Sequence, residues 1–337
     1  MTTQNIYKQS RILLLGYSSI ARRRVIPAML QSSHTLLVGI ASKHNYQHIK
    51  EKVEAYQSYK MAIDKSGCDT VYISLHNSAH YQWICYALSK GKNIICDKPA
   101  VLTKTEAQDC FRLASKNKLL IFESLPYLHH QQHHTLLQLL NRQRDSLQAI
   151  VAYFGIPAPP QENYRSSHDL GGGCIYDLGP YLVSVGQHYF NSSPTTIVTY
   201  PIYKKRRGEG PDSIAATIGY RNHGVVHGYI GFGLEYINKL ELWGESFHFS
   251  LNPAFTSPPN TSVAIQYKSQ DTIKTIAIQP CDAFSEMLKD YRLIQLSGKY
   301  QKTNSSFLKR ATVLDALVQS ARMDRPRRNG KQILDVS

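Results

Sequence analysis

Short apolar runs alternate with helix-type spacing along the first third of the chain. Asn77 or Ser78 is expected to cap the helix that follows the third run, and Gly91 to end it. Thr103 and Glu106 form a T-x-x-E capping box that opens another helix. Strands alternating with helices predict an α/β Rossmann domain, a doubly wound parallel sheet covered on both faces. The strand-like runs cover residues 11–15, 35–41, 70–75, 93–96 and 119–122.

After about residue 146 the pattern changes to strand-like runs separated by Gly, Pro, Asn or Ser. Residues 220–224 between two runs predict a hairpin turn. The pattern predicts an α+β domain, built on an open, mostly antiparallel sheet with a few helices. The runs begin near residues 147, 195, 213, 224, 237 and 261, and helical patterns cover residues 174–189, 283–296 and 308–323.

These patterns divide the chain into three parts. Residues 1–128 are expected to form the Rossmann dinucleotide-binding domain. Residues 129–305 are expected to form an α+β domain for substrate binding and oligomerisation, with the open face of its sheet as the contact between subunits. Residues 306–337 are expected to form a C-terminal helix and tail that pack back on the first domain.

The composition suits a protein with well-buried cores. Of 337 residues, 42% are hydrophobic and 19% are charged. No apolar run is long enough to span a membrane, and the N-terminal segment lacks the apolar centre of a signal peptide. Six scattered cysteines without a C-x-x-C pair indicate reduced thiols and a cytoplasmic protein. They are Cys68, Cys85, Cys96, Cys110, Cys174 and Cys281.

The chain carries an excess of positive charge. Lys and Arg number 39 against 24 Asp and Glu, a formal net charge of +15. The basic clusters at residues 22–24, 204–207 and 325–328 are short, and none lies in a known nucleic-acid-binding module. We therefore expect an anionic small-molecule substrate or a solvated basic surface, and neither nucleic acid nor membrane as a partner.

The first strand leads into a turn that suits a dinucleotide. Gly16, Ser18 and Ala21 take the three small positions of the phosphate-binding fingerprint, with Ser and Ala in place of two glycines. Gly16 permits a tight turn, Ser18 permits close approach of a pyrophosphate, and Ala21 lets the helix lie near the sheet. The free N–H groups of that helix would face the anion.

The end of the second strand predicts which dinucleotide binds. An NAD site usually has Asp or Glu there for the ribose hydroxyls. Residues 1–50 contain no acidic residue, and Ala41 is followed by Ser42, Lys43 and His44. A hydroxyl and a cation can hold the extra 2′-phosphate, with Arg22 as a second contact. NADP(H) is therefore preferred over NAD(H).

Four further segments resemble the oxidoreductase family named after glucose–fructose oxidoreductase and inositol dehydrogenase, Gfo/Idh/MocA. Asp97-Lys98-Pro99 is similar to its E-K-P motif, with Asp in place of Glu. GGGCIYDLGPY at residues 171–181 is similar to the G-G-G…D-x-G-x-Y/H pattern. ESLPYLHHQQ at residues 123–132 resembles E-x-x-x-Y-x-x-H-x-Q, and NYR at residues 163–165 also fits. The opening segment from Gly16 to Ala28 resembles the family's G-x-x-x-I-A-x-x-x-x-P-A pattern.

The resemblance implies hydride transfer with Lys98, Asp177 and Tyr181 as the catalytic group. Lys98 follows the carboxyl end of a parallel strand, where such sheets bind ligands, and its ammonium can stabilise negative charge on a reacting oxygen. Tyr181 would exchange the hydroxyl proton, with a nearby cation lowering its pKa, and Asp177 would orient Lys98 or the substrate. Pro180 is expected to kink or locally open the helix that carries Asp177 and Tyr181.

Further residues are expected to line the two binding sites, and no metal site is expected. The histidines at 129, 130, 133 and 134 have helical spacing but no completing carboxylate or cysteine nearby. The expected cofactor contacts are Gly16, Ser18, Ser19, Ile20, Ala21, Arg22, Ser42, Lys43, His44, His76, Asn77, His80, Asp97, Lys98 and Pro99. The expected substrate contacts are Lys98, Tyr127, His130, Arg165, Asp177 and Tyr181.

Three functions remain open at this point. The first is NADPH-dependent reduction of a ketosugar, and the segments RRRVIPAM and FSLNPAF resemble the family's nucleotide-sugar ketoreductases. The second is NADP-dependent oxidation of a free sugar, polyol or dihydrodiol. The third is a sensor or assembly protein that binds the cofactor without turnover. The expected assembly is a homo-oligomer such as a dimer.

Overall fold

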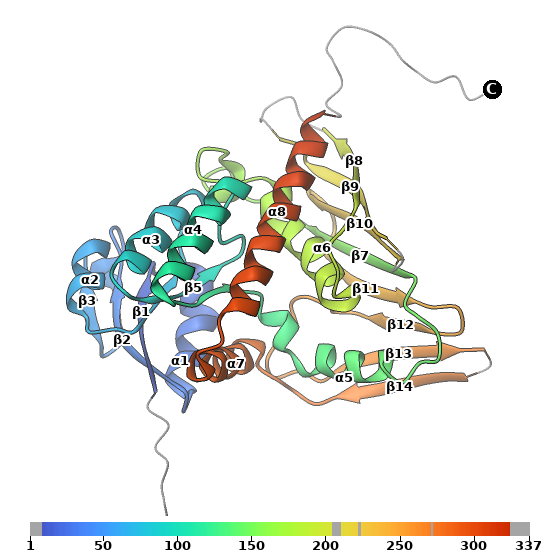
Figure 1. Cartoon of the computed structure of the whole chain (residues 1–337), viewed down its shortest axis with the longest axis horizontal. Coiled ribbons are helices and arrows are strands. Elements are labelled where there is room, and N and C mark those ends of the chain that lie inside the picture. Colours follow the sequence, from blue (N-terminus) through green and yellow to red (C-terminus); the bar gives the residue numbers. More distant parts are fainter. Residues whose placement is uncertain (1–8, 204–209, 222–223, 271, 324–337) are drawn as a thin grey trace, which may run out of the picture.

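The computed structural model describes residues 9–203, 210–221, 224–270 and 272–323. Two sheets stand side by side in it, each with helices against it, and the long C-terminal helix runs between them (Figure 1). The basic clusters at residues 204–207 and 325–328 and the tail beyond residue 323 lie outside the described residues, as does the tip of the hairpin turn at residues 222–223. Among the residues described, no helix is long and apolar enough to cross a membrane.

The first sheet confirms the doubly wound parallel arrangement. Its strand order is β3-β2-β1-β4-β5-β6, and every neighbouring pair is parallel. β1 lies between β2 and β4, so the chain reverses direction across the sheet at the carboxyl end of β1, where such folds bind ligands. The strands are β1 (Ser10–Leu15), β2 (Thr35–Ala41), β3 (Glu54–Tyr56), β4 (Thr70–Ile73), β5 (Asn93–Asp97) and β6 (Ile121–Ser124).

The helices of this half begin at several of the predicted signals. Thr103 and Glu106 form the predicted capping box, and Gly91 follows the end of α3 with a φ of +70°. The predicted cap of α3 was wrong: His76 is the N-cap, and the Asn77 side chain reaches Gly171 instead. The helices are η1 (Ala21–Val25, with π geometry), α1 (Ile26–Gln31), η2 (Tyr46–His48), α2 (Tyr59–Lys65), α3 (Asn77–Ser89) and α4 (Lys104–Asn117).

The second sheet is mostly antiparallel, as expected. Its eight strands have the order β14-β13-β12-β11-β7-β10-β9-β8, and the only parallel pair in this order is β7 with β10. Buried and partly buried positions alternate along β9, which is typical of a sheet with one more fully covered face. The strands are β7 (Ala149–Ile156), β8 (Thr196–Ile202), β9 (Ser213–Tyr220), β10 (Gly224–Phe232), β11 (Ile237–Trp243), β12 (His248–Leu251), β13 (Val263–Ser269) and β14 (Thr272–Ile278).

Helix α6 covers the inner face of the second sheet. Leu178 and Leu182 of α6 are buried in one core with Ile150 of β7 and Ile230 of β10. The glycine run at residues 171–173 directly precedes this helix. The remaining helices are η3 (Pro126–His129), α5 (Gln131–Leu140), η4 (Tyr164–Ser166), α6 (Cys174–Phe190), α7 (Ala283–Ser297) and α8 (Gln301–Met323).

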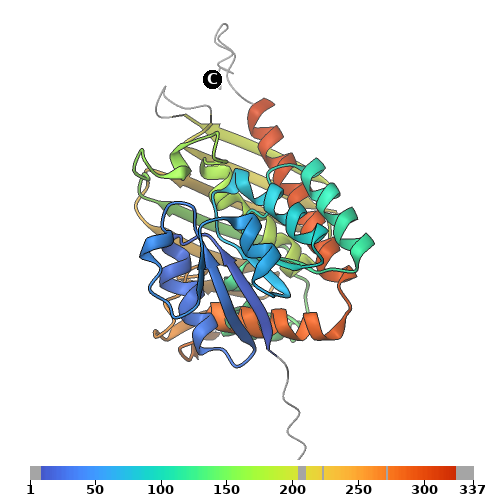
Figure 2. The same cartoon turned by 90° about the vertical axis from the view of Figure 1, so that its left-hand side faces the viewer.

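The last two helices join the halves of the molecule. In α7, Met287 and Tyr291 belong to the same core as Ile12 of β1, and the Tyr291 hydroxyl lies 2.6 Å from the hydroxyl of Thr70. In α8, Phe307 packs in the first domain's core and Leu317 in that of the second sheet. Figure 2 shows α7 beneath the first sheet and α8 passing behind its helices. The first sheet is thus covered in part by the end of the chain.

Candidate active site

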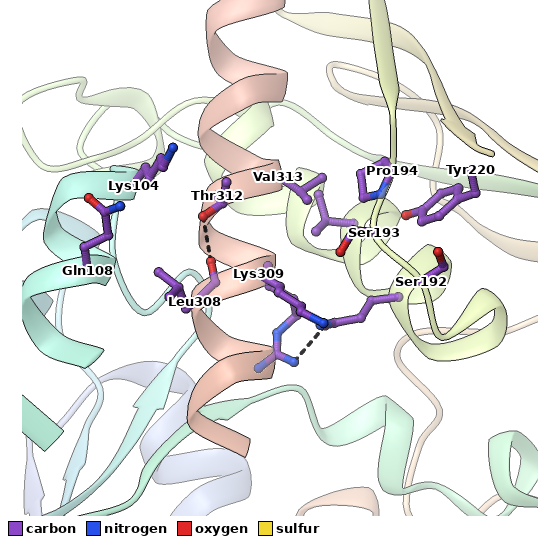
Figure 3. Close-up of a pocket in the computed structure, with 13 residues that line it drawn as sticks. Lys104, Gln108, Ser192, Ser193, Pro194, Tyr220, Leu308, Lys309, Thr312 and Val313 are labelled. Atoms are coloured by element: carbon purple, nitrogen blue, oxygen red, sulfur yellow. Dashed lines mark hydrogen bonds between the residues drawn. The ribbon is translucent and has the colours of Figure 1, made fainter. Parts of the chain in front are cut away.

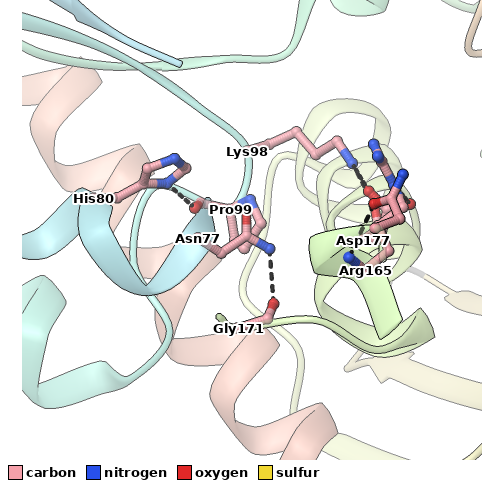
Figure 4. Close-up of polar contacts among 8 residues, drawn as sticks. Asn77, His80, Lys98, Pro99, Arg165, Gly171 and Asp177 are labelled. Carbon is pink, nitrogen blue, oxygen red and sulfur yellow. Dashed lines mark hydrogen bonds and ion pairs between the residues drawn. The ribbon is translucent and has the colours of Figure 1, made fainter. Parts of the chain in front are cut away.

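Lys98 lies directly after β5 and points toward the start of α6. Its Nζ donates a hydrogen bond to the backbone oxygen of Asp177 at 2.5 Å and another to Oδ1 of Asp177 at 2.9 Å (Figure 4). An ammonium has three N–H groups, so one remains for a further acceptor. Burial by itself lowers the pKa of Lys98, but the charge and hydrogen bond of Asp177, together with the nearby Tyr181 and Tyr164, raise the pKa above its usual value. The amine therefore stays charged at neutral pH.

Asp177 lies between two cations. Its Oδ1 accepts from Lys98, and its Oδ2 accepts from Nε of Arg165 at 2.8 Å. Burial would raise the pKa of this carboxyl, but Lys98 and Arg165 hold it below its usual value. One carboxylate between two cations leaves the cluster with a net positive charge. Such a cluster favours a negative charge that develops on a neighbouring oxygen.

Tyr181 lies beside this cluster on the next turn of α6. The Lys98 ammonium is 5.1 Å from the centre of its ring, which is the geometry of a cation–π contact. The ring packs against three aromatic rings, with centroid distances of 4.8 Å to Phe154, 5.1 Å to Phe255 and 5.5 Å to Tyr127. The hydroxyl, by contrast, has no hydrogen-bond partner among the described residues.

The expected lowering of the Tyr181 pKa was wrong. Burial raises the pKa of Tyr181, and this effect is larger than the lowering caused by Lys98. The hydroxyl is therefore protonated at neutral pH and able to donate a proton. This protonation state suits a general acid more than a general base.

Helix α6 runs without a break through Pro180. The local opening expected at this proline does not separate the catalytic candidates, since Tyr181 and Asp177 both contact Lys98. The proline's carbonyl accepts a hydrogen bond from Ser184, whose hydroxyl also lies 2.6 Å from the Tyr127 hydroxyl. Tyr127 is buried at 2% exposure and lies behind the Tyr181 ring. Tyr127 was expected to bind substrate. In the structure it packs against the ring of Tyr181.

A buried ion pair supports the segment after Lys98. Oε1 of Glu123 accepts the backbone N–H of Ala100 at 3.1 Å, and its Oε2 accepts Nε of Arg310 at 2.6 Å. Glu123 is the first residue of the E-x-x-x-Y segment, so the sequence motif includes it. Its partner on α8 belongs to no motif. Sequence reasoning missed this pair as part of the site.

The loop before α6 is tied to the start of α3. Nδ2 of Asn77 donates to the backbone oxygen of Gly171 at 2.9 Å, and the N–H of Ser78 donates to the backbone oxygen of Leu170. His80 is fully buried, with its ring nitrogens 2.9 Å from the Pro99 oxygen and 3.1 Å from the Leu75 oxygen. Figure 4 shows Asn77, His80 and Pro99 on one side and Gly171 across from them. These residues join the two domains beside Lys98.

The turn after β1 has the geometry of a phosphate loop. Gly16 has a φ of +100°, and a Cβ there would lie 2.1 Å from the backbone oxygen of Ser74. The Ser18 hydroxyl lies 2.8 Å from that of Ser74 and accepts the N–H of Ala21. Ala21 is fully buried, so its small side chain lets the helix lie against the sheet. Ser19 and Ile20 begin the helical turn here, with Ile20 37% exposed.

The residues after β2 keep cations near the expected ribose site. Ser42 is buried and accepts the N–H of Asn45, while Lys43 lies 5.4 Å from the ring centre of Tyr59. His44 is exposed, and the Arg22 guanidinium lies 5.5 Å from the ring centre of Tyr17. The acid-free stretch ends at Glu51, whose carboxylate accepts from the Tyr17 hydroxyl. Ser42, Lys43 and Arg22 stay the predicted contacts of a 2′-phosphate.

Asp97 links the phosphate loop to the lysine segment. Its carboxylate accepts hydrogen bonds from the Tyr72 hydroxyl at 2.8 Å and the Ser74 hydroxyl at 2.7 Å. Burial raises the pKa of Asp97, against the lowering effect of those hydroxyls. Ser74 therefore contacts both Ser18 and Asp97, and its neighbour His76 lies nearby with Nδ1 3.0 Å from the Ser78 hydroxyl.

The histidines near residue 130 do not converge on Lys98. His130 is buried at 1% exposure and caps α5 through the N–H of Gln132. His129 pairs with Asp290 on α7, and His133 lies between the Tyr189 hydroxyl and the Ala254 oxygen. Each ring thus has a structural contact of its own. The expected contact of His130 with substrate stays a prediction.

A separate hollow of about 330 Å³ lies on α8, away from these residues (Figure 3). Lys104 and Gln108 of α4 are on one side of it, and Ser192, Pro194 and Tyr220 are on the other. None of the residues expected to bind substrate or cofactor lines it. Arg310, the partner of Glu123, also lines this hollow, but Lys98, Asp177 and Tyr181 do not.

Comparisons with known proteins agree with the family resemblance of the sequence motifs. Residues 10–125 match the model of an oxidoreductase family with an NAD-binding Rossmann fold, and residues 146–249 match the model of the GFO/IDH/MocA C-terminal domain. The dTDP-3,4-didehydro-2,6-dideoxy-α-D-glucose 3-reductase of Streptomyces antibioticus is 26% identical, over 93% of this chain and 97% of the relative. The NADP⁺-dependent D-xylose 1-dehydrogenase 2 of Haloferax volcanii is 22% identical, over 91% and 96%.

Solved structures share the fold over nearly the whole length. A 3-ketoreductase from Actinomadura kijaniata, crystallised with NADP and TDP-benzene, aligns with a TM-score of 0.87 at 24% identity, over 93% of this chain and 98% of that one. An aldose–aldose oxidoreductase from Caulobacter crescentus, complexed with glycerol, aligns with a TM-score of 0.84 at 18% identity, over 94% and 99%. Two chains of different substrate class therefore share this architecture.

Proposed function

The chain belongs to the GFO/IDH/MocA oxidoreductase family, and from this premise we propose that it reduces the keto group of a nucleotide-linked sugar with NADPH. The observation that carries the proposal is the contact of Lys98 with both Asp177 and Tyr181. The similarity to dTDP-ketosugar 3-reductases over almost the full chain supports the substrate class. The net positive charge of +15 suits a diphosphate-linked substrate.

The residues of the first domain fit NADPH. Gly16 and the helical turn at Ser19 to Ala21 would hold the pyrophosphate, and Ser42 with Lys43 would hold the 2′-phosphate. When bound, NADPH supplies the hydride. Crystal structures of the similar 3-ketoreductase contain NADP, which supports this choice of cofactor.

Each catalytic residue then has a distinct task. The free N–H of Lys98 donates to the substrate's carbonyl oxygen and stabilises the negative charge that forms there. The Tyr181 hydroxyl, protonated at neutral pH, gives its proton to that oxygen. Asp177 holds the ammonium in place through two hydrogen bonds, and Arg165 holds Asp177. The positive cluster therefore favours the charged transition state over the neutral ketone.

Replacement of the lysine tests the proposal directly. We expect Lys98→Met to lower kcat for reduction of a dTDP-linked 3-ketosugar by about 10²–10³-fold, because one donor to the developing charge is lost. The Kd for NADPH should change less than about threefold, measured by fluorescence titration. Lys116→Met, at an exposed position in the last turn of α4, is the control. Undiminished turnover in Lys98→Met would refute the mechanism.

A second candidate function is oxidation of a free sugar or diol with NADP⁺. The similarity to a D-xylose 1-dehydrogenase and to trans-1,2-dihydrobenzene-1,2-diol dehydrogenases favours it. Parallel assays separate the two: NADPH oxidation with keto-sugar nucleotides, and NADP⁺ reduction with free sugars and dihydrodiols. NADPH binding without turnover in either assay would instead support a sensor or assembly protein.

We also propose that the outer face of the second sheet is a contact between subunits. Thr199 of β8 is buried against Ser320 of α8, so Val198 and Tyr200 face away from the helices, 63% and 72% exposed. Exposed apolar side chains on one face mark an interaction surface. Light scattering should give a dimer or higher oligomer for the native chain and a smaller species for Tyr200→Glu. A monomeric native chain would refute the proposal.

We further propose a cytoplasmic location for the enzyme. All six cysteines are free thiols, which is typical of a reducing compartment. Thiol labelling of the protein taken directly from cell extract, without a reductant, tests this. If none of the six thiols reacted with the label after the protein was unfolded, a cytoplasmic location would be contradicted.

A further inference from the structure

Two cysteines from the neighbouring helices α3 and α4 lie in contact, on the face of the first sheet that these helices cover. The sulfur of Cys85 on α3 is 3.9 Å from the sulfur of Cys110 on α4. The two helices pack against each other over the same face of the sheet (Figure 1). Cys85 is partly exposed, whereas Cys110 is fully buried. Neither residue contacts the Lys98 cluster, so the reaction leaves this pair unexplained.

The two thiols are chemically different. The contact with Cys110 lowers the pKa of Cys85, against the effect of burial. The same contact, together with burial, raises the pKa of Cys110. Tyr81, one turn before Cys85, also lowers the pKa of Cys85, whereas Asp109 and Glu106 on α4 raise it. Cys85 is thus the sulfur that solvent reaches and that forms a thiolate more readily.

We propose that Cys85 and Cys110 form a reversible disulfide when the enzyme meets a peroxide. The Cys85 thiolate attacks one oxygen of hydrogen peroxide, the O–O bond breaks, and Cys85 sulfenic acid and water form after uptake of one proton. The Cys110 thiol then attacks the Cys85 sulfur, the S–O bond breaks, and a second water leaves with the thiol's proton. Two thiols lose two electrons, and one peroxide is reduced to two waters.

The bond would close a loop around the catalytic segment. Residues 85–110 include β5 and Lys98, so the crosslink ties together the two helices on either side of them. The sulfurs are already in contact, and no residue of the Lys98 cluster touches either cysteine among the described residues. We therefore expect the oxidised enzyme to keep its turnover within about twofold. The crosslink stabilises the fold and protects Cys85 from irreversible oxidation, since a neighbouring thiol traps the sulfenic acid.

Mass spectrometry of the NADPH-depleted, NADP⁺-bound enzyme tests the inference. In a Cys281→Ser background, which removes the other partly exposed thiol, peroxide should lower the monomer mass by about 2 Da, and dithiothreitol should restore it. Peptide mapping should join Cys85 to Cys110. The melting temperature of the oxidised form should rise by roughly 3–6 °C.

The single variants separate this chemistry from general oxidation. Cys110→Ser lacks the resolving thiol, and Cys85 in it should gain about 32 Da as a sulfinic acid that dithiothreitol does not remove. Cys85→Ser should show neither change at low peroxide. The inference fails if the Cys281→Ser protein gains about 32 Da at Cys85 as readily as Cys110→Ser does, or if Cys85 pairs with another cysteine. Because these readouts are masses, they stand or fall independently of the proposed reaction.

Discussion

At Asp177 both carboxylate oxygens are occupied by cations, which fixes the charge state of the whole catalytic cluster. The pKa of Asp177 is held below its usual 3.8 and that of Tyr181 above its usual 10.0. The active form, with Asp177 ionised and Tyr181 protonated, therefore exists at every pH between these limits. The interval includes neutral pH.

The pH profile of ketone reduction follows from these directions. Since Tyr181 acts in its protonated form and its pKa lies above 10.0, kcat should stay level through neutral pH and fall only above about pH 10. Tyr181→Phe should lower kcat by about 10²–10⁴-fold. Stopped-flow measurement of NADPH oxidation from pH 6 to above pH 10 checks both. A base limb near pH 8 in the native enzyme would contradict the assignment.

Arg165 is a positioning residue, and its removal should alter the acid side of the profile. Without the guanidinium, Oδ2 of Asp177 loses its 2.8 Å partner and one of the two cations that lower its pKa. In Arg165→Met the pKa of Asp177 should rise, so an acid limb of kcat should move upward toward neutral pH, with kcat about tenfold lower at pH 7. If Arg165→Lys restored both the acid limb and the kcat at pH 7, the charge of residue 165 would matter more than the geometry of its guanidinium. A change in KM alone would contradict the assignment.

Sequence reasoning proposed the catalytic residues because they lie in contiguous motifs, and missed their supports because those depend on distant contacts. Lys98, Asp177 and Tyr181 were assigned from short patterns, and the structure brings the three together. The partner of Glu123 is Arg310, 187 residues later, and nothing local indicates that pairing. The direction of the Tyr181 pKa was wrong because burial cannot be weighed against a cation without the packing around the ring.

Among the elements, prediction succeeded where the pattern was long and periodic. β2 matches its predicted range, and β9 and β10 begin at their predicted residues, whereas β3, β12 and β14 were missed. β3 has three residues and β12 has four, too short for alternation to stand out. β14 is largely exposed, so its residues alternate little in polarity. Short or exposed strands are recognised only from the partners beside them.

The turn between β1 and the first helix depends on its glycine. Gly16→Ala places a Cβ 2.1 Å from the Ser74 oxygen at a φ of +100° and should cost about 2 kcal/mol or more in stability. Gly91→Ala is a matched control, since φ there is +70° and nothing lies within 4 Å of the added atom; it should cost about 1 kcal/mol. Thermal melts and NADPH titrations of both variants check this. Equal losses in the two would show that φ alone matters.

Across the whole molecule, a buried histidine sets a limit on stability in acid. Burial lowers the pKa of His133 from 6.5 to about 3. Below pH 6.5 the unfolded chain therefore binds a proton that the folded chain does not, and stability falls until about pH 3. The loss from this residue should be about 3 kcal/mol between pH 7 and pH 4. His133→Gln should flatten this slope in urea unfolding curves measured at several pH values, and an unchanged slope would exclude His133 as the cause.

The class of each sheet was predictable, and so was a C-terminal helix that packs against the first domain, but the route of α7 was not. The helical pattern at residues 283–296 identifies an apolar face and not the surface that it covers. In the structure, Tyr291 of that helix is buried against the first sheet. The division at residues 128 and 305 stays a proposal, and domain-by-domain unfolding would test it.

That placement of α7 and α8 affects synthesis on the ribosome. β6 ends at Ser124, but the first sheet's faces also need Tyr291 and Ala311. At about 5–20 residues per second, the nascent chain grows for roughly 10–40 s after β6 before that cover emerges. During this time the apolar surface of the first sheet is exposed and can bind chaperones. A nascent chain that stalls or ends before α7 and α8 leaves this surface uncovered.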